Sequence, residues 1–241
     1  LLGETAQGWL ILKEYTGPAV RLEVQEKLLS AIRDSGFSGV EQLQRNREGE
    51  LISYDQDRTA YIVKTWFEGR ECNLRDVKEC QSAVKMLGRL HRAMELPQLA
   101  TECGSRPFRL EKEYARHNRE LKKVRRYLRQ KGQKSEFEIY LLHHYDGFYE
   151  KALETAEKLQ EETADGDGAQ EAVHCFCHGD FQHHNLLCCR DGFAVVNFEK
   201  YLLDNPVRDL YLFLRKLLEK NSWSPSLALS ILTAYETQRT L

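Results

Sequence analysis

The sequence lacks a run of apolar residues close to the roughly 18 that a membrane span requires. Its first residues also lack a charged segment followed by an apolar one, so no signal peptide is visible. Neither charge is in clear excess: 35 Lys and Arg residues stand against 37 Asp and Glu residues, and the formal net charge is -2. These absences argue against a membrane protein and against a general electrostatic attraction to nucleic acid.

An even set of cysteines is also missing. The chain has 7 cysteines, and an odd number argues against a closed disulfide framework. Reduced thiols in a cytoplasmic protein are the expectation. A zinc site is the alternative, because cysteines and histidines cluster late in the chain, although their spacing matches no familiar zinc module. The cluster consists of Cys175, Cys177, His178, His183, His184, Cys188 and Cys189.

What the sequence does contain is enough apolar residues, 41% of 241, to bury a large core as one domain or as two lobes. It begins at Leu1 rather than at a methionine, so we expect a piece of a longer chain. In the first part, apolar runs, helical spacing and turn residues predict a strand, a helix and two further strands. The predicted elements are a turn at 4–8, a strand at 9–15, a helix at 20–34 capped by Gly36, and strands at 50–54 and 59–67.

Beyond residue 68 the pattern becomes helical. An apolar stripe predicts a helix that Pro97 ends, and two long polar helices, a loop and two short strands follow. Pro206 and Pro225 each suit the first turn of a final helix. The ranges are 111–131 and 136–162 for the long helices, 165–168 for the loop, and 173–177 and 193–196 for the strands; the stripe is Val77, Cys80, Val84, Leu87, Leu90 and Met94, and the last helical core face is Leu210, Phe213, Leu214 and Leu217.

This order predicts an α+β protein-kinase-like bilobal fold. A small β-rich N-lobe would span residues 1–67, and a larger helical C-lobe with the catalytic residues would span 68–241.

The two late strands flank the pattern H-x-D-x-x-x-x-N, formed by His178, Asp180 and Asn185. In phosphoryl transfer such an aspartate orients the acceptor hydroxyl or accepts its proton, and such an asparagine binds a magnesium ion through its amide oxygen. We expect His178 to brace the loop rather than to react. An aspartate and an asparagine in a loop can also make only turn hydrogen bonds. The companion features favour the catalytic interpretation, because a strand lysine, a following helix and a later metal-site motif occur in the order that kinases use.

Lys13, in the strand at 9–15, is the candidate phosphate-binding lysine. Its expected partner is Glu26 on the following helix, with Glu23 as the alternative. A strand lysine at a sheet edge and a solvated helical glutamate are the competing interpretations.

These residues together resemble the aminoglycoside phosphotransferase and choline kinase-like family, and most of all its branch of CotS-type spore coat proteins. The resemblance covers nearly the whole chain and rests on residues 9–13, 66–70, 87–93, 178–185 and 204–210. It implies ATP and Mg²⁺ as cofactors and transfer of the γ-phosphate to a small-molecule hydroxyl. It makes Asp180 the base, Asn185 a metal ligand and Lys13 the phosphate lysine, and it gives Asp204 and Asp209 structural roles. The CotS branch adds association with other spore coat proteins and a cytoplasmic or spore coat location.

Two departures from the family pattern matter. Asn197 stands where the family carries a metal-binding aspartate, and it keeps one oxygen but loses the charge that a hard cation prefers. Glu199, two residues further, would face the same side if the segment is a strand, so it is a candidate replacement ligand. The second departure is at the start of the chain, where the glycine-rich phosphate loop of the family is expected upstream of Leu1.

A basic segment spans residues 112–134. It could contact polyanionic partners or an anionic substrate, and a solvated helix face is the simpler interpretation. Few aromatic residues are interleaved with its charges, which disfavours single-stranded nucleic acid.

The sequence leaves two main hypotheses for the function. The first is an ATP-dependent phosphotransferase, and the second is a weak or inactive pseudokinase that acts as a spore coat structural or interaction protein. Asn197 favours the second.

Overall fold

The computed structural model describes residues 1–6, 8–164 and 175–241, which form two compact units. The first unit comprises Leu1–Pro107 and Val173–Leu241, and the second comprises Phe108–Ala172. The expected boundary between residues 67 and 68 lies inside the first unit. The loop predicted at 165–168 and the first two residues of the strand predicted at 173–177 lie outside the described residues.

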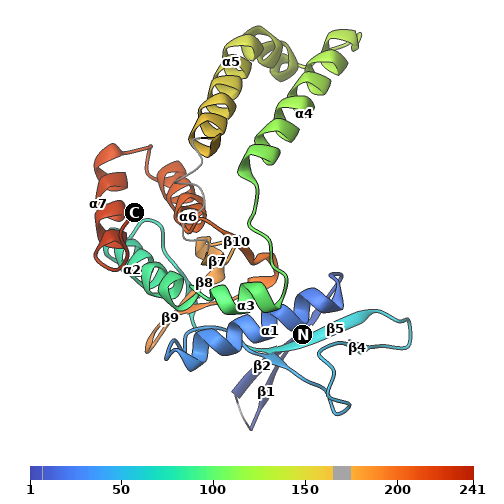
Figure 1. Cartoon of the computed structure of the whole chain (residues 1–241), viewed down its shortest axis with the longest axis vertical. Coiled ribbons are helices and arrows are strands. Elements are labelled where there is room, and N and C mark those ends of the chain that lie inside the picture. The colour runs from blue at the N-terminus through green and yellow to red at the C-terminus, as the bar shows by residue number, and fades with distance from the viewer. Residues whose placement is uncertain (7, 165–174) are drawn as a thin grey trace. The chain divides into compact units, whose positions relative to one another are not determined.

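The predicted α+β class is confirmed: a small antiparallel sheet near the N-terminus precedes a mostly helical remainder (Figure 1). The strands are β1 (Leu2–Thr5), β2 (Gly8–Glu14), β3 (Leu43–Gln44), β4 (Ser53–Tyr54), β5 (Ala60–Thr65), β6 (Arg70–Glu71), β7 (Cys175–Cys177), β8 (Leu186–Cys189), β9 (Gly192–Val195) and β10 (Leu202–Asp204). The helices are α1 (Ala19–Asp34), α2 (Val77–Ala93), α3 (Pro97–Glu102), α4 (Leu110–Gln130), α5 (Glu136–Ala164), α6 (Val207–Lys220) and α7 (Pro225–Glu236), with short 3₁₀ turns η1 (His183–Asn185) and η2 (Phe198–Lys200).

The N-terminal sheet has the strand order β1-β2-β5-β3, and β4 also pairs with β5. The predicted turn at 4–8 is the β1–β2 hairpin, closed where Thr5 pairs with Gly8. In the antiparallel β2–β5 pair, Lys13 lies opposite Ile62 and Lys64 lies opposite Ile11. Because alternate residues of a strand point to the same face, Lys13 and Lys64 project from one face of the sheet.

Helix α1 follows Pro18 and ends near Gly36, as its sequence predicts. Gly36 has φ +91°, a left-handed conformation that suits glycine after a helix end. The buried positions of α1 are Leu22, Gln25, Leu28, Leu29 and Ile32. The register of the helix therefore turns Gln25 toward the interior, whereas Glu23 and Glu26 are not among the buried residues.

Helices α2 and α7 of the first unit pack against each other, and they lie next to each other in Figure 1. Asp76 caps α2 by accepting a hydrogen bond from the Glu79 amide at 3.1 Å. Gly88 of α2 permits the close approach of the chain at the end of α7, since a Cβ at position 88 would lie 2.8 Å from the Gln238 Cβ. Of the predicted α2 stripe, Val77 alone is exposed, because it occupies the first turn.

Two small sheets position the loop between β7 and β8, which is the predicted catalytic loop with Asp180 and Asn185. Strand β7 pairs with β10, and β8 pairs with both β6 and β9. Strands β3, β6, β8 and β10 were not predicted, because none of these short segments alternates apolar and polar residues in a way that indicates a strand. The loop between β7 and β8 contains Asp180 and Asn185, so both of its ends are anchored in sheets.

The second unit is a pair of long helices, α4 and α5, that pack on each other close to their predicted ranges. The Arg125 guanidinium lies 4.6 Å from the Tyr145 ring centroid, and Asn118 donates to the Ala152 carbonyl at 3.3 Å. Among the described helices of the chain, none combines the length and the apolar character that a membrane span needs.

Candidate active site

The catalytic loop starts with a sharp turn at Gly179, where φ is +78°. A Cβ at this position would lie 2.2 Å from the Lys200 carbonyl oxygen, so only glycine fits. The buried Asp209 carboxylate holds the same turn, since it accepts the His178 amide at 2.7 Å and the Gly179 amide at 2.8 Å. This contact gives Asp209 a structural role.

His178 braces the loop from inside. Its Nδ1 accepts the Asp180 amide at 3.1 Å, and its Nε2 donates to the Val196 carbonyl at 2.9 Å, which places the ring proton on Nε2. The ring also packs edge-on against Phe198, with centroids 4.6 Å apart. The histidine therefore connects this loop to the segment that carries Asn197. Because both of its ring nitrogens are engaged in these hydrogen bonds, its role is to brace the loop.

Asp180 is held ionised at the surface of the site. One carboxylate oxygen accepts from Gln182 Nε2 at 2.6 Å, and the other lies 3.0 Å from Lys200 Nζ. Partial burial opposes ionisation, but these two donors outweigh it and lower the pKa of Asp180. Lys200 was not predicted as a site residue, although its place directly after the metal-site motif is a possible signal.

Asn185 and Asn197, the two predicted metal-binding amides, lie next to each other. Asn197 Nδ2 donates to Asn185 Oδ1 at 2.9 Å, and Asn185 Nδ2 donates to the Asp180 carbonyl at 2.7 Å. Asn197 has φ +69°, a left-handed conformation that asparagine tolerates better than most residues. The two side chains thus meet as the sequence predicts, but each contributes its oxygen to a hydrogen bond.

Two lysines of the N-terminal sheet face this pair. Asn197 Oδ1 accepts from Lys64 at 2.9 Å and from Lys13 at 3.4 Å. Glu199 Oε1 accepts from the same two ammonium groups, at 3.0 Å and 2.8 Å. Residues 198–200 form a 3₁₀ turn and not a strand, yet the Glu199 carboxylate does lie on the same side as Asn197, since both accept from Lys13 and Lys64.

Lys64 was not predicted as a site residue. Its side chain has no exposed surface and lies 2.8 Å from a Glu41 carboxylate oxygen that is equally buried. Burial opposes the charge on Lys64, but Glu41 and Glu199 outweigh that effect and raise its pKa. The opposite effect occurs at Glu199: burial opposes its charge, but Lys64 and Lys13 outweigh that effect and lower the pKa of Glu199 to about 2.

Glu41 also fixes the backbone of the metal-site segment. Its carboxylate accepts the amide of Asn197 at 2.8 Å and the amide of Phe198 at 3.0 Å. Neither Glu41 nor Lys64 belongs to a pattern visible in sequence, since a lone charged residue in a strand or loop is most often solvated. Only the fold shows that the two are buried together.

The expected partnership of Lys13 with Glu26 is wrong, and so is the alternative with Glu23. Both glutamates pair with Arg45, Glu26 at 3.4 Å and Glu23 at 2.8 Å. The register of α1 is the reason, because it directs these side chains to the outer face. The buried lysine–glutamate pair of this site is Lys64 with Glu41 instead.

The magnesium ion that the resemblance implies does not fit this donor set. Mg²⁺ requires several oxygens at about 2.0–2.1 Å and prefers anionic ones. Here Asn185 and Asn197 supply neutral oxygens that already accept hydrogen bonds, and Glu199 Oε1 is shared by two ammonium groups. A dication on these atoms would also lie within a few ångströms of two positive charges.

The sequence matches the profile of the phosphotransferase enzyme family over residues 1–240. The chain belongs to this family. A comparison of the chain with curated protein sequences found no match.

Solved structures of phosphotransferases have the same fold. An aminoglycoside phosphotransferase from Alicyclobacillus acidocaldarius is 17% identical, with a TM-score of 0.78 over 99% of this chain and 71% of that chain. An amicoumacin kinase in complex with AMP-PNP, Ca²⁺ and Ami is 14% identical, with a TM-score of 0.64 over 100% of this chain and 70% of that chain. A choline kinase from Cryptosporidium parvum is 13% identical, with a TM-score of 0.57 over 96% and 66%.

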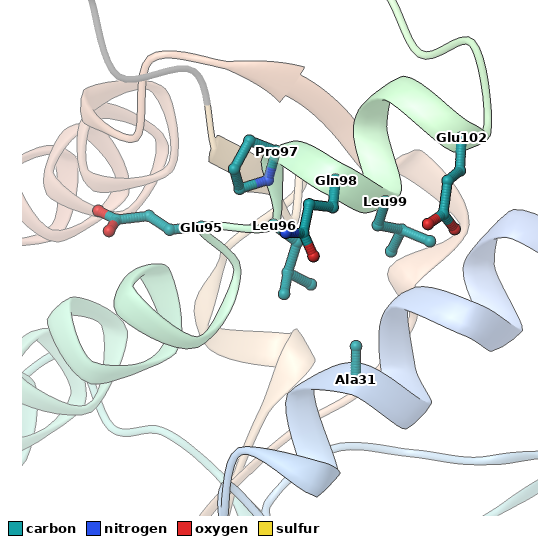
Figure 2. A pocket seen from close by; sticks show the side chains of 7 residues that line it. All are labelled: Ala31, Glu95, Leu96, Pro97, Gln98, Leu99 and Glu102. Atoms are coloured by element: carbon teal, nitrogen blue, oxygen red, sulfur yellow. The ribbon is translucent and has the colours of Figure 1, made fainter.

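A cavity of about 450 Å³ lies away from Asp180, between α1 and the segment that contains α3 (Figure 2). Ala31 of α1 faces Leu96 and Leu99 across it, and Glu95, Pro97, Gln98 and Glu102 complete the lining. None of the predicted site residues contributes to this cavity.

The cysteine–histidine cluster does not form the zinc site that was considered. In the described part of the chain, the group with potential ligand atoms within 4.8 Å of one another is His91, Cys177 and Asp209. His91 already bonds Tyr235 at 2.8 Å and Asp209 at 3.3 Å, and both Asp209 oxygens accept backbone amides. These contacts are those of a structural hydrogen-bond network.

The basic segment at 112–134 lies on α4 and the turn after it, and acidic partners neutralise part of its charge. Arg116 pairs with Glu120 at 2.9 Å, and Arg125 pairs with Asp146 at 2.6 Å. These pairs favour a solvated helix face over a polyanion site.

Proposed function

We propose that this chain is a nucleotide-binding pseudokinase of the phosphotransferase enzyme family, with weak or no γ-phosphate transfer. The supporting observation is Asn197: at the metal-aspartate position it carries no charge, and Lys64 and Lys13 already hold its oxygen. Phosphoryl transfer depends on neutralising charge at the phosphates and on placing the acceptor hydroxyl. In this site two candidate metal ligands, Asn185 and Asn197, are neutral, and the carboxylate of Glu199 is already shared by two lysines. Such a site could still place the acceptor hydroxyl, but it would lose most of the charge neutralisation that a bridging metal supplies.

Nucleotide binding itself relies on Lys13. Its side chain is 43% exposed, so its ammonium is available to phosphate oxygens while it contacts Glu199. Solved structures of kinases with a similar fold include nucleotide complexes, for example the amicoumacin kinase with AMP-PNP. We assign the phosphate-contacting role to Lys13, with Glu199 in place of Glu26 as its carboxylate partner.

The biological role that follows is structural or interactive, in the spore coat. This part rests on the resemblance of the sequence to CotS-type proteins, and its partners would be other coat proteins. It is tested by expressing a fluorescent fusion of the full-length protein in a spore-forming host. Fluorescence confined to the mother cell cytoplasm throughout sporulation would contradict it.

A working phosphotransferase for a small-molecule hydroxyl is the second candidate. It is favoured by Asp180, whose ionised carboxylate lies on a loop fixed by His178 and Asp209. Such an enzyme would orient an acceptor hydroxyl at Asp180.

One experiment separates the two. The melting temperature of the full-length protein is measured with ATP and ADP, and ATP consumption is compared between the wild type and Asp180→Ala. A ligand that binds the native state raises the melting temperature. A shift together with consumption that Asp180→Ala does not reduce supports the pseudokinase. Consumption that this variant abolishes supports the enzyme, and no shift with either nucleotide contradicts both.

A further inference from the structure

The ammonium group of Lys64 has a complete set of acceptors. A lysine ammonium has three N–H donors. Lys64 Nζ lies 2.8 Å from Glu41 Oε2, 2.9 Å from Asn197 Oδ1 and 3.0 Å from Glu199 Oε1. Three oxygens from three separate segments thus surround one buried cation, which is the arrangement expected of a coordinated ion.

The charges around this group balance without any metal. Lys64 and Lys13 supply two positive charges, and Glu41 and Glu199 supply two negative ones. An aspartate at position 197 would add a third negative charge, which a bound divalent ion would have to compensate. Asparagine at 197 and lysine at 64 are therefore complementary, because each makes the other acceptable in a buried site.

The oxygens that could bind an ion are also fixed in direction. Both Glu41 oxygens accept backbone amides, from Asn197 and Phe198, in addition to the Lys64 contact. Asn185 Oδ1 accepts from the Asn197 amide group. Glu41 Oε2 already accepts from both Lys64 and the Asn197 amide, so coordinating a metal through it would break a bond that holds the site together.

We propose that Lys64 is the resident cation of this site, in the place of a divalent metal ion, and that phosphate binding at Lys13 is therefore independent of divalent metals. The ligand class is a nucleoside diphosphate or triphosphate in its metal-free form. The phosphate part of the proposal rests on the proposed nucleotide binding, whereas the part about Lys64 does not.

The first test measures ADP affinity by calorimetry for the full-length wild type, once with excess EDTA and once with excess Mg²⁺. We expect the two dissociation constants to agree within about twofold, where a metal-dependent site changes by about tenfold or more. Clearly weaker binding in EDTA overturns the proposal. Lack of binding in both conditions overturns the proposed nucleotide binding and leaves the role of Lys64 to the second test.

The second test measures Mn²⁺ binding by electron paramagnetic resonance without nucleotide. The wild type is compared with Lys64→Met/Asn197→Asp and with Lys27→Met as an exposed control. We expect the double variant alone to bind Mn²⁺, since it regains a carboxylate and loses the competing ammonium. Binding by the wild type that Asn185→Ala removes overturns the proposal, and so does a folded double variant that binds no Mn²⁺. Circular dichroism reports folding, and if the double variant does not fold, the wild-type measurements decide.

Discussion

The ammonium of Lys64 lies 2.8 Å from the carboxylate of Glu41, and neither side chain has any exposed surface. This pair connects strand β5 to the segment that precedes β3, and through the Glu41 oxygens it also holds the backbone at Asn197. Its stability consequences can be measured independently of any function.

Glu41→Gln should be strongly destabilising. Removing one partner of a buried ion pair typically costs about 3–5 kcal/mol, because the remaining charge is left uncompensated. Urea denaturation measures the loss. Glu23→Gln is the matched control, since its pair with Arg45 lies at the surface, and it should leave the free energy of unfolding unchanged. In a double-mutant cycle, adding Lys64→Met to Glu41→Gln should restore part of the loss, and strictly additive effects would contradict direct coupling.

Acid should weaken the contribution of Glu199 in a defined window. Its pKa is about 2 in the folded protein against an ordinary 4.5, so the ionised form stabilises the native state above about pH 4.5. This contribution is lost as the pH falls from about 4.5 toward 2. We expect the wild type to be more stable than Glu199→Gln at neutral pH and the difference to shrink through this window. Urea denaturation at several pH values measures it, and a constant difference would show that the ion pairs do not form.

The turn before Asp180 should tolerate no side chain. Gly179→Ala combines a left-handed backbone with a Cβ placed 2.2 Å from the Lys200 carbonyl. Its cost should exceed the roughly 1–3 kcal/mol of a strained backbone alone. Gly192→Ala is the control, because Gly192 also has positive φ, +125°, but its Cβ would meet no atom within 4 Å. Thermal denaturation compares the two, and equal losses would mean that the contact with Lys200 does not exist.

Tyr235→Phe should destabilise the interface between α2 and α7. The tyrosine hydroxyl donates to His91 Nδ1 at 2.8 Å in a fully buried position. Without it, the ring nitrogen has no partner, which costs about 1–3 kcal/mol. Chemical denaturation gives the value. Tyr54→Phe is the exposed counterpart and should be neutral, and a neutral Tyr235→Phe would indicate that water replaces the hydroxyl.

Much of this architecture is predictable from sequence, because long helices with an apolar stripe and strands with strong flanking turns carry local signals. The α1 helix, the long α4 and α5 helices and the β1–β2 hairpin were confirmed within a few residues. The pattern at 178–185 predicts a catalytic loop because its spacing is fixed by the chemistry of phosphoryl transfer, and the catalytic roles of its residues stay a prediction. Asn185 and Asn197 were predicted to share a site, and they share a hydrogen bond.

Pairings across the fold were not predictable. Lys13 was assigned to a glutamate of the next helix, but the helix register decides which side chains point inward, and a single residue of rotation exchanges Glu26 for Gln25. Glu41 lies outside every predicted element, and Lys64 has no sequence signal beyond being a lysine in an apolar strand. Their burial depends on contacts between segments far apart in the chain, which local patterns do not encode.

The paired arrangement of Lys64 and Asn197 constrains how this site could be converted to bind a divalent ion. Introducing aspartate at position 197 alone would give Lys64 a stronger partner and would not open a place for an ion. Replacing Lys64 alone would leave Glu41 buried without its counter-charge, and stability would fall. Each single change is therefore either ineffective or harmful, so the site gains a metal-binding carboxylate only when both residues change together.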